Sequence, residues 1–245
     1  MTDTSSPDLA TALEAAPADG TPVGPPARDP QRTHLRLMLT LTFATGIVDA
    51  VGFLGLDRVF TANMTGNVVI LGMALTGADD LPVTGPALAL VGFVLGAVLA
   101  GRALGGLTGA WSAVCTGLLC GVGTLVIGLG ILLMLWADAP HPVLLGVTGA
   151  LGLAMGAQAA TARAIAVKDV TTVVITSTIT GLAMDSRLAG GSGPLWARRL
   201  LAVALMLVGA TVGALLLRVH VGAGLVLAGL ICAVTALIGH RRGRV

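Results

Sequence analysis

Long apolar runs with few charged residues follow one another from Leu35 to near the end of the chain. Eight such runs can be separated, at residues 35–56, 60–77, 86–108, 113–137, 143–166, 170–184, 197–217 and 221–239. A helix needs about 20 apolar residues to cross the hydrocarbon core of a bilayer. The pattern therefore predicts an all-α, polytopic protein that crosses a membrane several times.

Two of these runs are shorter and more polar than the others. The second run begins Phe60-Thr61-Ala62-Asn63-Met64-Thr65-Gly66-Asn67, and the sixth begins Val170-Thr171-Thr172-Val173-Val174-Ile175-Thr176-Ser177-Thr178. Threonine, asparagine and glycine at this density disfavour a regular helix start. We expect extended backbone that leads into a half-helix in each of the two runs.

The charges in the connecting loops favour six crossings over eight. If both polar runs enter the membrane and return on the same side, the loops around Asp79 and Asp138, which contain no Lys or Arg, lie outside. The cytoplasmic side, with both termini, then holds Arg102, Lys168, Arg187, Arg198, Arg199, Arg241, Arg242 and Arg244. Arg218 alone opposes this arrangement. Eight spans, four in each half, is the alternative.

The two halves of the membrane region repeat the same order of segments. Gly46-Ile47-Val48-Asp49-Ala50 corresponds to Gly156-Ala157-Gln158-Ala159-Ala160, and Thr65-Gly66-Asn67 corresponds to Thr176-Ser177-Thr178. We place the two repeats at residues 34–138 and 139–245. Because three crossings is an odd number, the two three-helix repeats are expected to be inverted relative to each other, as in many transporters.

Composition supports the membrane assignment and excludes other classes of protein. Apolar residues make up 55% of the chain and charged residues only 11%, too few polar groups to cover a soluble fold. A net charge of +2 is too small for a face that binds nucleic acid. Residues 1–33 are rich in Pro, Gly, Ala, Asp and Ser, and we expect a disordered cytoplasmic tail there.

Asp49 is the first candidate for chemistry, because it lies inside the first apolar run. A carboxyl group there is costly and usually faces the bundle interior or a wet cavity. It is interpreted either as a proton- or cation-coupling site or as a buried carboxyl bonded to neighbouring backbone. Arg58, just beyond the same helix, is its expected partner. Gln158, in the corresponding stretch of the second half, is expected to line the same cavity.

The threonines of the two polar runs are the second candidate feature. Thr65 and Thr176 mark the expected change from extended backbone to helix, where their hydroxyls would cap free N–H groups. Two half-helix N-termini that face one another carry partial positive charge and bind anions without a basic side chain. The alternative is that these threonines only bond between helices. Asn63, Asn67 and Thr178 complete the expected lining.

Motifs for catalysis or metal binding do not occur in the sequence. The four histidines lie at loops or segment ends without metal-ligand spacing, and no GxSxG motif is found. We therefore expect no enzymatic activity, no cofactor and no bound metal. GxxxG pairs such as Gly92/Gly96 and Gly209/Gly213 allow helices to approach closely, and such faces also allow copies of the chain to associate.

The runs Gly46-Ile47-Val48-Asp49-Ala50-Val51-Gly52-Phe53 and Phe60-Thr61-Ala62-Asn63-Met64-Thr65-Gly66-Asn67 resemble the YoaK family of small bacterial membrane proteins. The second half is similar at Met155-Gly156-Ala157-Gln158 and Thr176-Ser177-Thr178-Ile179-Thr180, but it has Ala159 where the family has Asn and Ser177 where the family has Gly. The resemblance covers about residues 35 to 240. It implies a multi-pass protein of the bacterial inner membrane and no particular activity.

Taken together, the residues predict a transporter or channel for a small solute. The half-helix termini favour an anionic solute, and Asp49 favours coupling to a proton or a cation. The expected pathway is lined by Asp49, Asn63, Thr65, Asn67, Gln158, Thr176 and Thr178. The alternative is a non-transporting membrane scaffold or regulatory protein, which would use its GxxxG faces as assembly surfaces.

Overall fold

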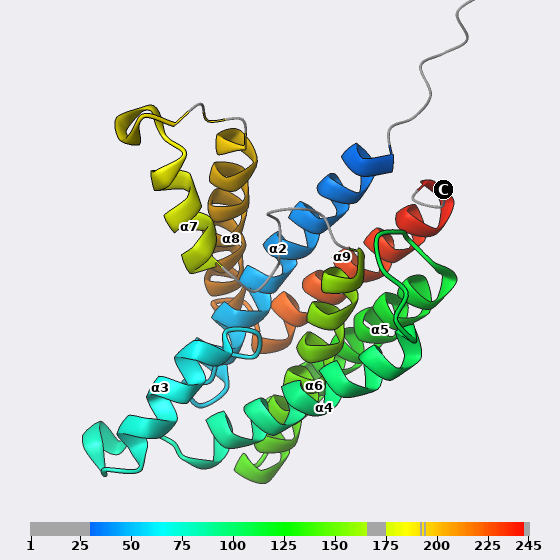
Figure 1. Ribbon diagram of the computed structural model, residues 1–245. Helices are drawn as coiled ribbons and strands as arrows, with labels where there is room; N and C mark the ends of the chain where they lie inside the picture. The colour runs from blue at the N-terminus through cyan, green and yellow to red at the C-terminus, as the bar shows by residue number, and fades with distance from the viewer. Residues whose placement is uncertain (1–29, 166–174, 192, 194, 243–245) are drawn as a thin grey trace, which may run out of the picture.

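Six long helices form the membrane bundle. The computed structural model describes residues 30–165, 175–191, 193 and 195–242, and within these it contains helices and coil but no strand. The long helices are α2 (Pro30–Gly55), α4 (Thr84–Leu104), α5 (Ala113–Leu135), α6 (His141–Ile165), α8 (Trp196–Leu217) and α9 (Val221–Arg242). Each is long and apolar enough to cross a bilayer, and Figure 1 shows them packed side by side.

Two short helices correspond to the two polar runs. They are α3 (Met64–Ala74) and α7 (Ile175–Met184), and each is followed by a 3-10 turn, η1 (Ala78–Asp80) and η2 (Arg187–Ala189). With 11 and 10 residues they are about 16 and 15 Å long, half the thickness of the hydrocarbon core. The expectation of six spans is confirmed, and the eight-span alternative is not supported.

The helix directions follow from the glycines at which pairs of helices touch. Phe43 and Ile47 of α2 lie against Gly209 and Gly213 of α8, so α2 and α8 run in the same direction. On α4, Gly92 and Gly96 lie against Gly149 and Leu153 of α6, so these two helices are also parallel.

The pair α5 and α9 runs antiparallel instead. Gly123 lies against Gly229, and Gly130, further along α5, lies against Gly222, which comes earlier in α9. At each of these positions a side chain would collide with the backbone of the partner helix. Close backbone contact at glycine is the usual means of helix association in lipid, where burial of apolar side chains gives little driving force.

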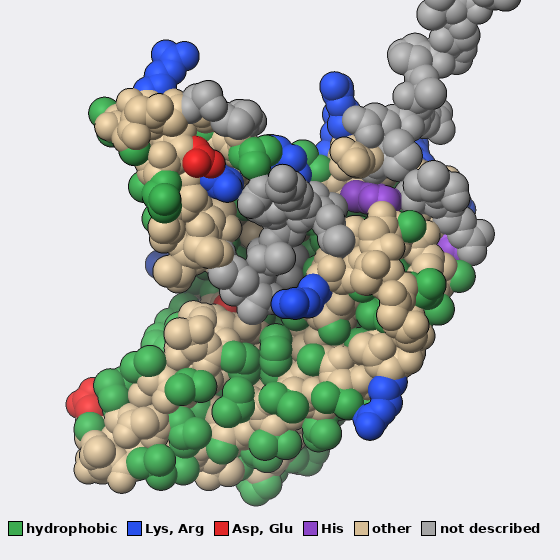
Figure 2. Space-filling view, viewed as in Figure 1, with side chains coloured by type: hydrophobic (Ala, Val, Ile, Leu, Met, Phe, Trp, Pro, Cys, Tyr) green, Lys and Arg blue, Asp and Glu red, His purple; other side chains and the backbone are tan. Residues whose placement is uncertain are grey.

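The bundle has one basic end and one acidic end. The N-terminus of α2 and the C-terminus of α9 lie together at the basic end (Figure 1). The helix directions place at this end the described bases Arg32, Arg36, Arg102, Arg163, Arg187, Arg198, Arg199, Arg241 and Arg242. The opposite, acidic end holds Asp57, Asp79, Asp80 and Asp138, together with Arg58 and Arg218, so two bases and not Arg218 alone oppose the expected arrangement of charge. Figure 2 shows acidic side chains at the tip of the molecule beside α3.

Large apolar side chains cover the outside of the bundle. Leu95 is 51% exposed, Leu135 84% and Leu207 67%, whereas the bundle interior holds buried polar groups such as Asp49 and Gln158. An outer surface of large apolar side chains, with polar groups buried in the interior, differs from the surface of a soluble protein and suits a hydrocarbon solvent.

One expected boundary is wrong. Helix α2 begins at Pro30, so residues 30–33 belong to the first crossing and not to the tail. Proline suits the first turn of a helix, because the N–H that it lacks has no partner there. Residues 1–29, the rest of the expected tail, lie outside the described residues.

Sidedness reporters test the six-span arrangement. A reporter inserted at Asp79, after α3, and one inserted at Arg187, after α7, should lie on opposite sides of the membrane, because both short helices return to the side from which the chain entered. Reporter fusions that are active on only one side provide the measurement. If both positions report the same side, the short helices cross the membrane and the fold is eight-span.

A pair of glycine substitutions tests the packing. A Cβ at Gly96 would lie 2.0 Å from the Leu153 carbonyl oxygen, whereas nothing lies within 4 Å of a Cβ at Gly121. Gly96→Ala should therefore lower the free energy of unfolding by about 1–3 kcal/mol. Gly121→Ala should leave it unchanged or raise it by up to about 1 kcal/mol. Thermal unfolding in detergent compares the two, and equal effects would contradict the α4–α6 contact.

Candidate functional site

An open cavity of about 740 Å³ lies beside α2, where α3 and α7 begin. It is lined by Thr45, Asp49, Phe53, Phe60, Ala62, Asn63, Thr65, Gly66, Val69, Ile70, Ile175, Thr176 and Met206. The first residues of α3 and α7, which are more than a hundred positions apart in the sequence, thus meet beside α2 (Figure 1).

Asp49 holds the chain between α2 and α3 inside the bundle. Its Oδ1 atom accepts hydrogen bonds from the N–H groups of Thr61 (2.9 Å) and Ala62 (2.7 Å), and from the Thr61 hydroxyl (3.4 Å). Asp49 lies six residues before the end of α2 at Gly55, a depth of about 9 Å of helix. The segment after α2 therefore turns back into the bundle before α3 leaves it again, which makes it re-entrant.

Two asparagines fix the start of α3. The Asn67 amide donates to the Phe60 carbonyl oxygen (2.5 Å) and its Oδ1 accepts from the Phe60 N–H (2.9 Å). Asn63 is the N-cap, and its Oδ1 accepts from the Gly66 N–H at 3.2 Å. The prediction that Thr65 caps this helix is wrong. Thr65 is the second residue of α3 and lines the cavity.

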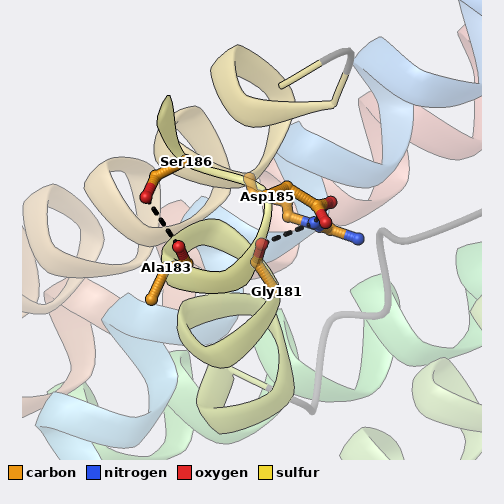
Figure 3. Close-up of polar contacts among 5 residues, drawn as sticks. Gly181, Ala183, Asp185 and Ser186 are labelled. Carbon is orange, nitrogen blue, oxygen red and sulfur yellow. Dashed lines mark hydrogen bonds and ion pairs between the residues drawn. The ribbon is translucent and has the colours of Figure 1, made fainter. Parts of the chain in front are cut away.

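Helix α7 begins at the cavity and is fastened at its other end. Arg199 of α8 donates to the Gly181 carbonyl oxygen at 2.8 Å and forms an ion pair with Asp185, beyond the last turn of α7 (Figure 3). The guanidinium group occupies the space where a side chain at Gly181 would lie. The ion pair therefore holds the end of α7 against α8, while Thr176 at its start lines the cavity.

Four of the seven expected pathway residues line this cavity, namely Asp49, Asn63, Thr65 and Thr176. The other three lie outside the cavity lining, although all are buried: Asn67, Gln158 and Thr178. Thr171 and Thr172 of the second polar run lie outside the described residues.

Gln158 reaches the site through Thr45. Its side-chain amide donates to the Thr45 hydroxyl oxygen at 2.9 Å, and the Cys232 thiol lies 3.7 Å from its Oε1 atom. The Thr45 hydroxyl in turn donates to the Leu41 carbonyl oxygen at 2.9 Å. Gln158, only 2% exposed, therefore positions Thr45 and does not itself meet the cavity.

Sequence reasoning missed Thr45 and Phe53. They lie one helical turn before and one turn after Asp49, so the three side chains share a face of α2. The spacing of four around the buried acid was the available signal. Phe53 also stacks on Phe60, with ring centroids 4.8 Å apart.

The expected pairing of Asp49 with Arg58 is wrong. Arg58 is exposed at the acidic end, and the partners of Asp49 are backbone N–H groups and a hydroxyl. An arginine brought to this depth would have to give up its hydration and find hydrogen bonds for all its N–H groups, whereas the backbone N–H groups are already there and themselves need an acceptor.

Comparisons with known proteins agree with this architecture. A family model described as a protein of unknown function (DUF1275) matches residues 37–238. The UPF0700 transmembrane protein YoaK of Bacillus subtilis (strain 168) is 31% identical over 150 residues, which are 61% of this chain and 65% of that relative. The match thus spans less than two thirds of the relative's length. No solved structure matches this chain.

The matched range begins within α2 and ends within α9, so it covers most of these two helices and all of the other long and short ones. It also agrees with the resemblance carried by the motifs around Asp49 and Asn63. This chain is therefore a multi-pass membrane protein that belongs to the DUF1275 family, to which the YoaK resemblance pointed.

Proposed function

We propose that this protein is a transporter or channel that carries a small solute through the cavity at the starts of α3 and α7. The observation that carries the proposal is the meeting of two interrupted helices at one cavity that a buried carboxylate lines. Non-helical backbone at membrane depth is tolerated where it lines a cavity, and discontinuous helices form the binding sites of many transporters.

The two short helices lead from the cavity to opposite ends of the bundle. Helix α3 runs from Asn63 at the cavity to the acidic end at Asp79, and α7 runs from Thr176 at the cavity to the basic end at Asp185. A solute in the cavity thus has one short helix on its way to each side. This is the arrangement that a route across the membrane requires.

The helix contacts also support an inverted repeat. An exchange of α2, α3, α4 and α5 with α6, α7, α8 and α9 preserves the helix contacts. Every contacting pair of described helices then becomes another contacting pair or, for α5–α9 and α2–α6, the same pair. For example, the contact α2–α8 becomes α6–α4, and α3–α4 becomes α7–α8. Since α2 and α6 run in opposite directions, we propose that the two halves are inverted. Inverted repeats of this kind form alternating-access transporters.

The same contacts repeat at single glycines. Gly46 meets the Met206 carbonyl oxygen and Gly156 meets that of Phe93. Gly46 and Gly156 are separated by as many positions as Phe43 and Leu153, and Phe93 and Met206 by as many as Gly96 and Gly209. The same exchange therefore also relates the contact of Gly209 with Phe43 to that of Gly96 with Leu153.

We further propose that the basic end faces the cytoplasm of a bacterial cell and that the membrane is the inner one. The support is the difference in charge between the two ends of the bundle, because short cytoplasmic loops of membrane proteins carry an excess of Arg and Lys. Both termini would then be cytoplasmic.

The rival function is that of a non-transporting scaffold, and one observation favours it. Gly117 and Gly121, a GxxxG pair on α5, touch no other described helix and lie along an apolar groove with Gly96 and Leu99. Such a face suits association with another helix in the membrane. A scaffold would use Asp49 only as an acceptor for the backbone of Thr61 and Ala62 and would not need the cavity beside it.

Cysteine accessibility tests the route. In a chain whose three native cysteines have been replaced, Thr65→Cys and Thr176→Cys should react with a membrane-impermeant maleimide in proteoliposomes, because both positions line a wet cavity. Leu151→Cys is the matched control, since Leu151 is fully buried in the dry core, and it should not react. Failure of both cavity positions to react in folded protein would contradict a hydrated pathway.

Substitution of Asp49 tests its part in transport. A solute found by thermal stabilisation of the purified protein should cross proteoliposome membranes at least about tenfold more slowly with Asp49→Asn, a loss of ~1.4 kcal/mol. The protein should remain folded, because the amide oxygen of Asn can still accept from Thr61 and Ala62. Asp138→Asn, exposed at the acidic end, should transport normally. Equal flux through all three proteins would contradict the role of Asp49.

A further inference from the structure

We infer that the solute is an organic cation with an apolar body, bound between the carboxylate of Asp49 and the stacked rings of Phe53 and Phe60. The inference rests on the proposed function, since it takes the cavity as the place where the solute binds. It deepens that proposal by choosing a charge and a chemical class for the solute.

The described lining of the cavity is negatively charged. Asp49 is 5% exposed and is the one ionisable side chain among the described residues that line the cavity. Its Oδ1 atom accepts hydrogen bonds from the N–H groups of Thr61 and Ala62. These bonds stabilise the carboxylate but bring no positive charge to it, so a cation in the cavity would be its counter-charge.

The start of α3 offers few donors to an anion. The Thr61 and Ala62 N–H groups bond to Asp49, and the N–H groups of Gly66 and Asn67 bond to the side-chain and main-chain oxygens of Asn63. The donors that make a helix N-terminus an anion site are therefore used within the protein. An anion at this place would also meet the Asp49 carboxylate.

An aromatic pair lies beside the carboxylate. Phe53 is one turn after Asp49 on the same face of α2, and its ring stacks on Phe60 with centroids 4.8 Å apart. Both rings line the same cavity as the carboxylate, and cations within about 6 Å of a ring centroid are attracted to its face. Aromatic rings and a carboxylate together recognise ammonium groups.

The size and lining of the cavity favour an organic ion over a metal ion. A volume of about 740 Å³ lies within the range of sites for small organic ligands. A dehydrated metal ion needs a compact shell of several oxygen ligands. Here the wall away from Asp49 consists largely of the apolar side chains Val69, Ile70, Ile175 and Met206. An apolar body of the solute would cover that wall.

Binding of three matched probes to the purified full-length chain tests the inference. Benzylammonium, benzamide and benzoate share a ring and differ in the charge of the head group, and calorimetry near neutral pH measures their dissociation constants. We expect benzylammonium to bind at least about tenfold more tightly than the other two. Asp49→Asn should weaken it by about 30-fold or more, because a buried charge loses its partner. Asp138→Asn should bind like the unchanged protein.

Phe53→Leu is a second variant that leaves the carboxylate and its backbone bonds in place. It should weaken benzylammonium by about two- to fivefold and leave benzamide unchanged, since only the cation gains from the ring face. Preferential binding of benzoate, equal binding of all three probes, or no binding of benzylammonium to folded protein would overturn the inference. Cation binding without flux in proteoliposomes would leave the cation site standing and refute the transport proposal. Flux of anionic solutes alone would leave the transport proposal standing and refute the cation site.

Discussion

The structure of the site depends on the hydrogen bonds from the backbone of Thr61 and Ala62 to Asp49. Extended backbone inside an apolar bundle leaves N–H and carbonyl groups without partners, and each unsatisfied buried group costs about 1–3 kcal/mol. Asp49 supplies an acceptor for two N–H groups, and Asn67 satisfies both the N–H and the carbonyl oxygen of Phe60. Two polar side chains thus allow the chain to turn back inside the bundle, and the start of α3 reaches the cavity because of them.

Close helix packing supplies the frame for this arrangement. Gly46 of α2 lies against α8 and Gly156 of α6 lies against α4, so the two central helices are held on their glycine sides. Thr45 and Asp49 of α2 line the cavity at which the first residues of the two short helices meet. The hydrogen bond from Gln158 to Thr45 connects α6 to the same face. The polar site is therefore built on helices whose separation is set by the absence of side chains.

The sequence predicts the six crossings and the two short runs well, because run length and loop charge are properties of single segments. It predicts less about the partners within the site. Arg58 is the expected partner of Asp49 because it is the nearest base in the sequence, but the partners in the structure are main-chain N–H groups. Every residue except proline carries such a group, so the residue type does not indicate which one bonds to Asp49.

The same limit explains the other differences. Capping by Asn63 and not by Thr65 depends on the residue at which the backbone leaves the helix, and helix ends are the least predictable feature of a sequence. Gln158 is expected to line the cavity but lies behind Thr45, because its position depends on the approach of α6 to α2, which only the packed bundle defines. The sequence does not indicate that Phe53 lines a cavity, because a lone aromatic residue in an apolar run usually belongs to the core.

The proposed repeat relates the packing of the two halves but not their chemistry. Under the proposed exchange of halves Asp49 corresponds to Ala159, so the carboxylate would have no counterpart in the second half. The described contacts of the short helices also differ in chemistry: Asp49 and Asn63 accept backbone N–H groups at and just before the start of α3, whereas the ion pair of Asp185 with Arg199 lies beyond the last turn of α7. A change that opens the cavity on one side and closes it on the other would therefore move two unlike elements. Asp49 belongs to α2 but bonds the segment that leads into α3, so a cation bound to this carboxylate, as we infer, would act directly on the anchor of α3.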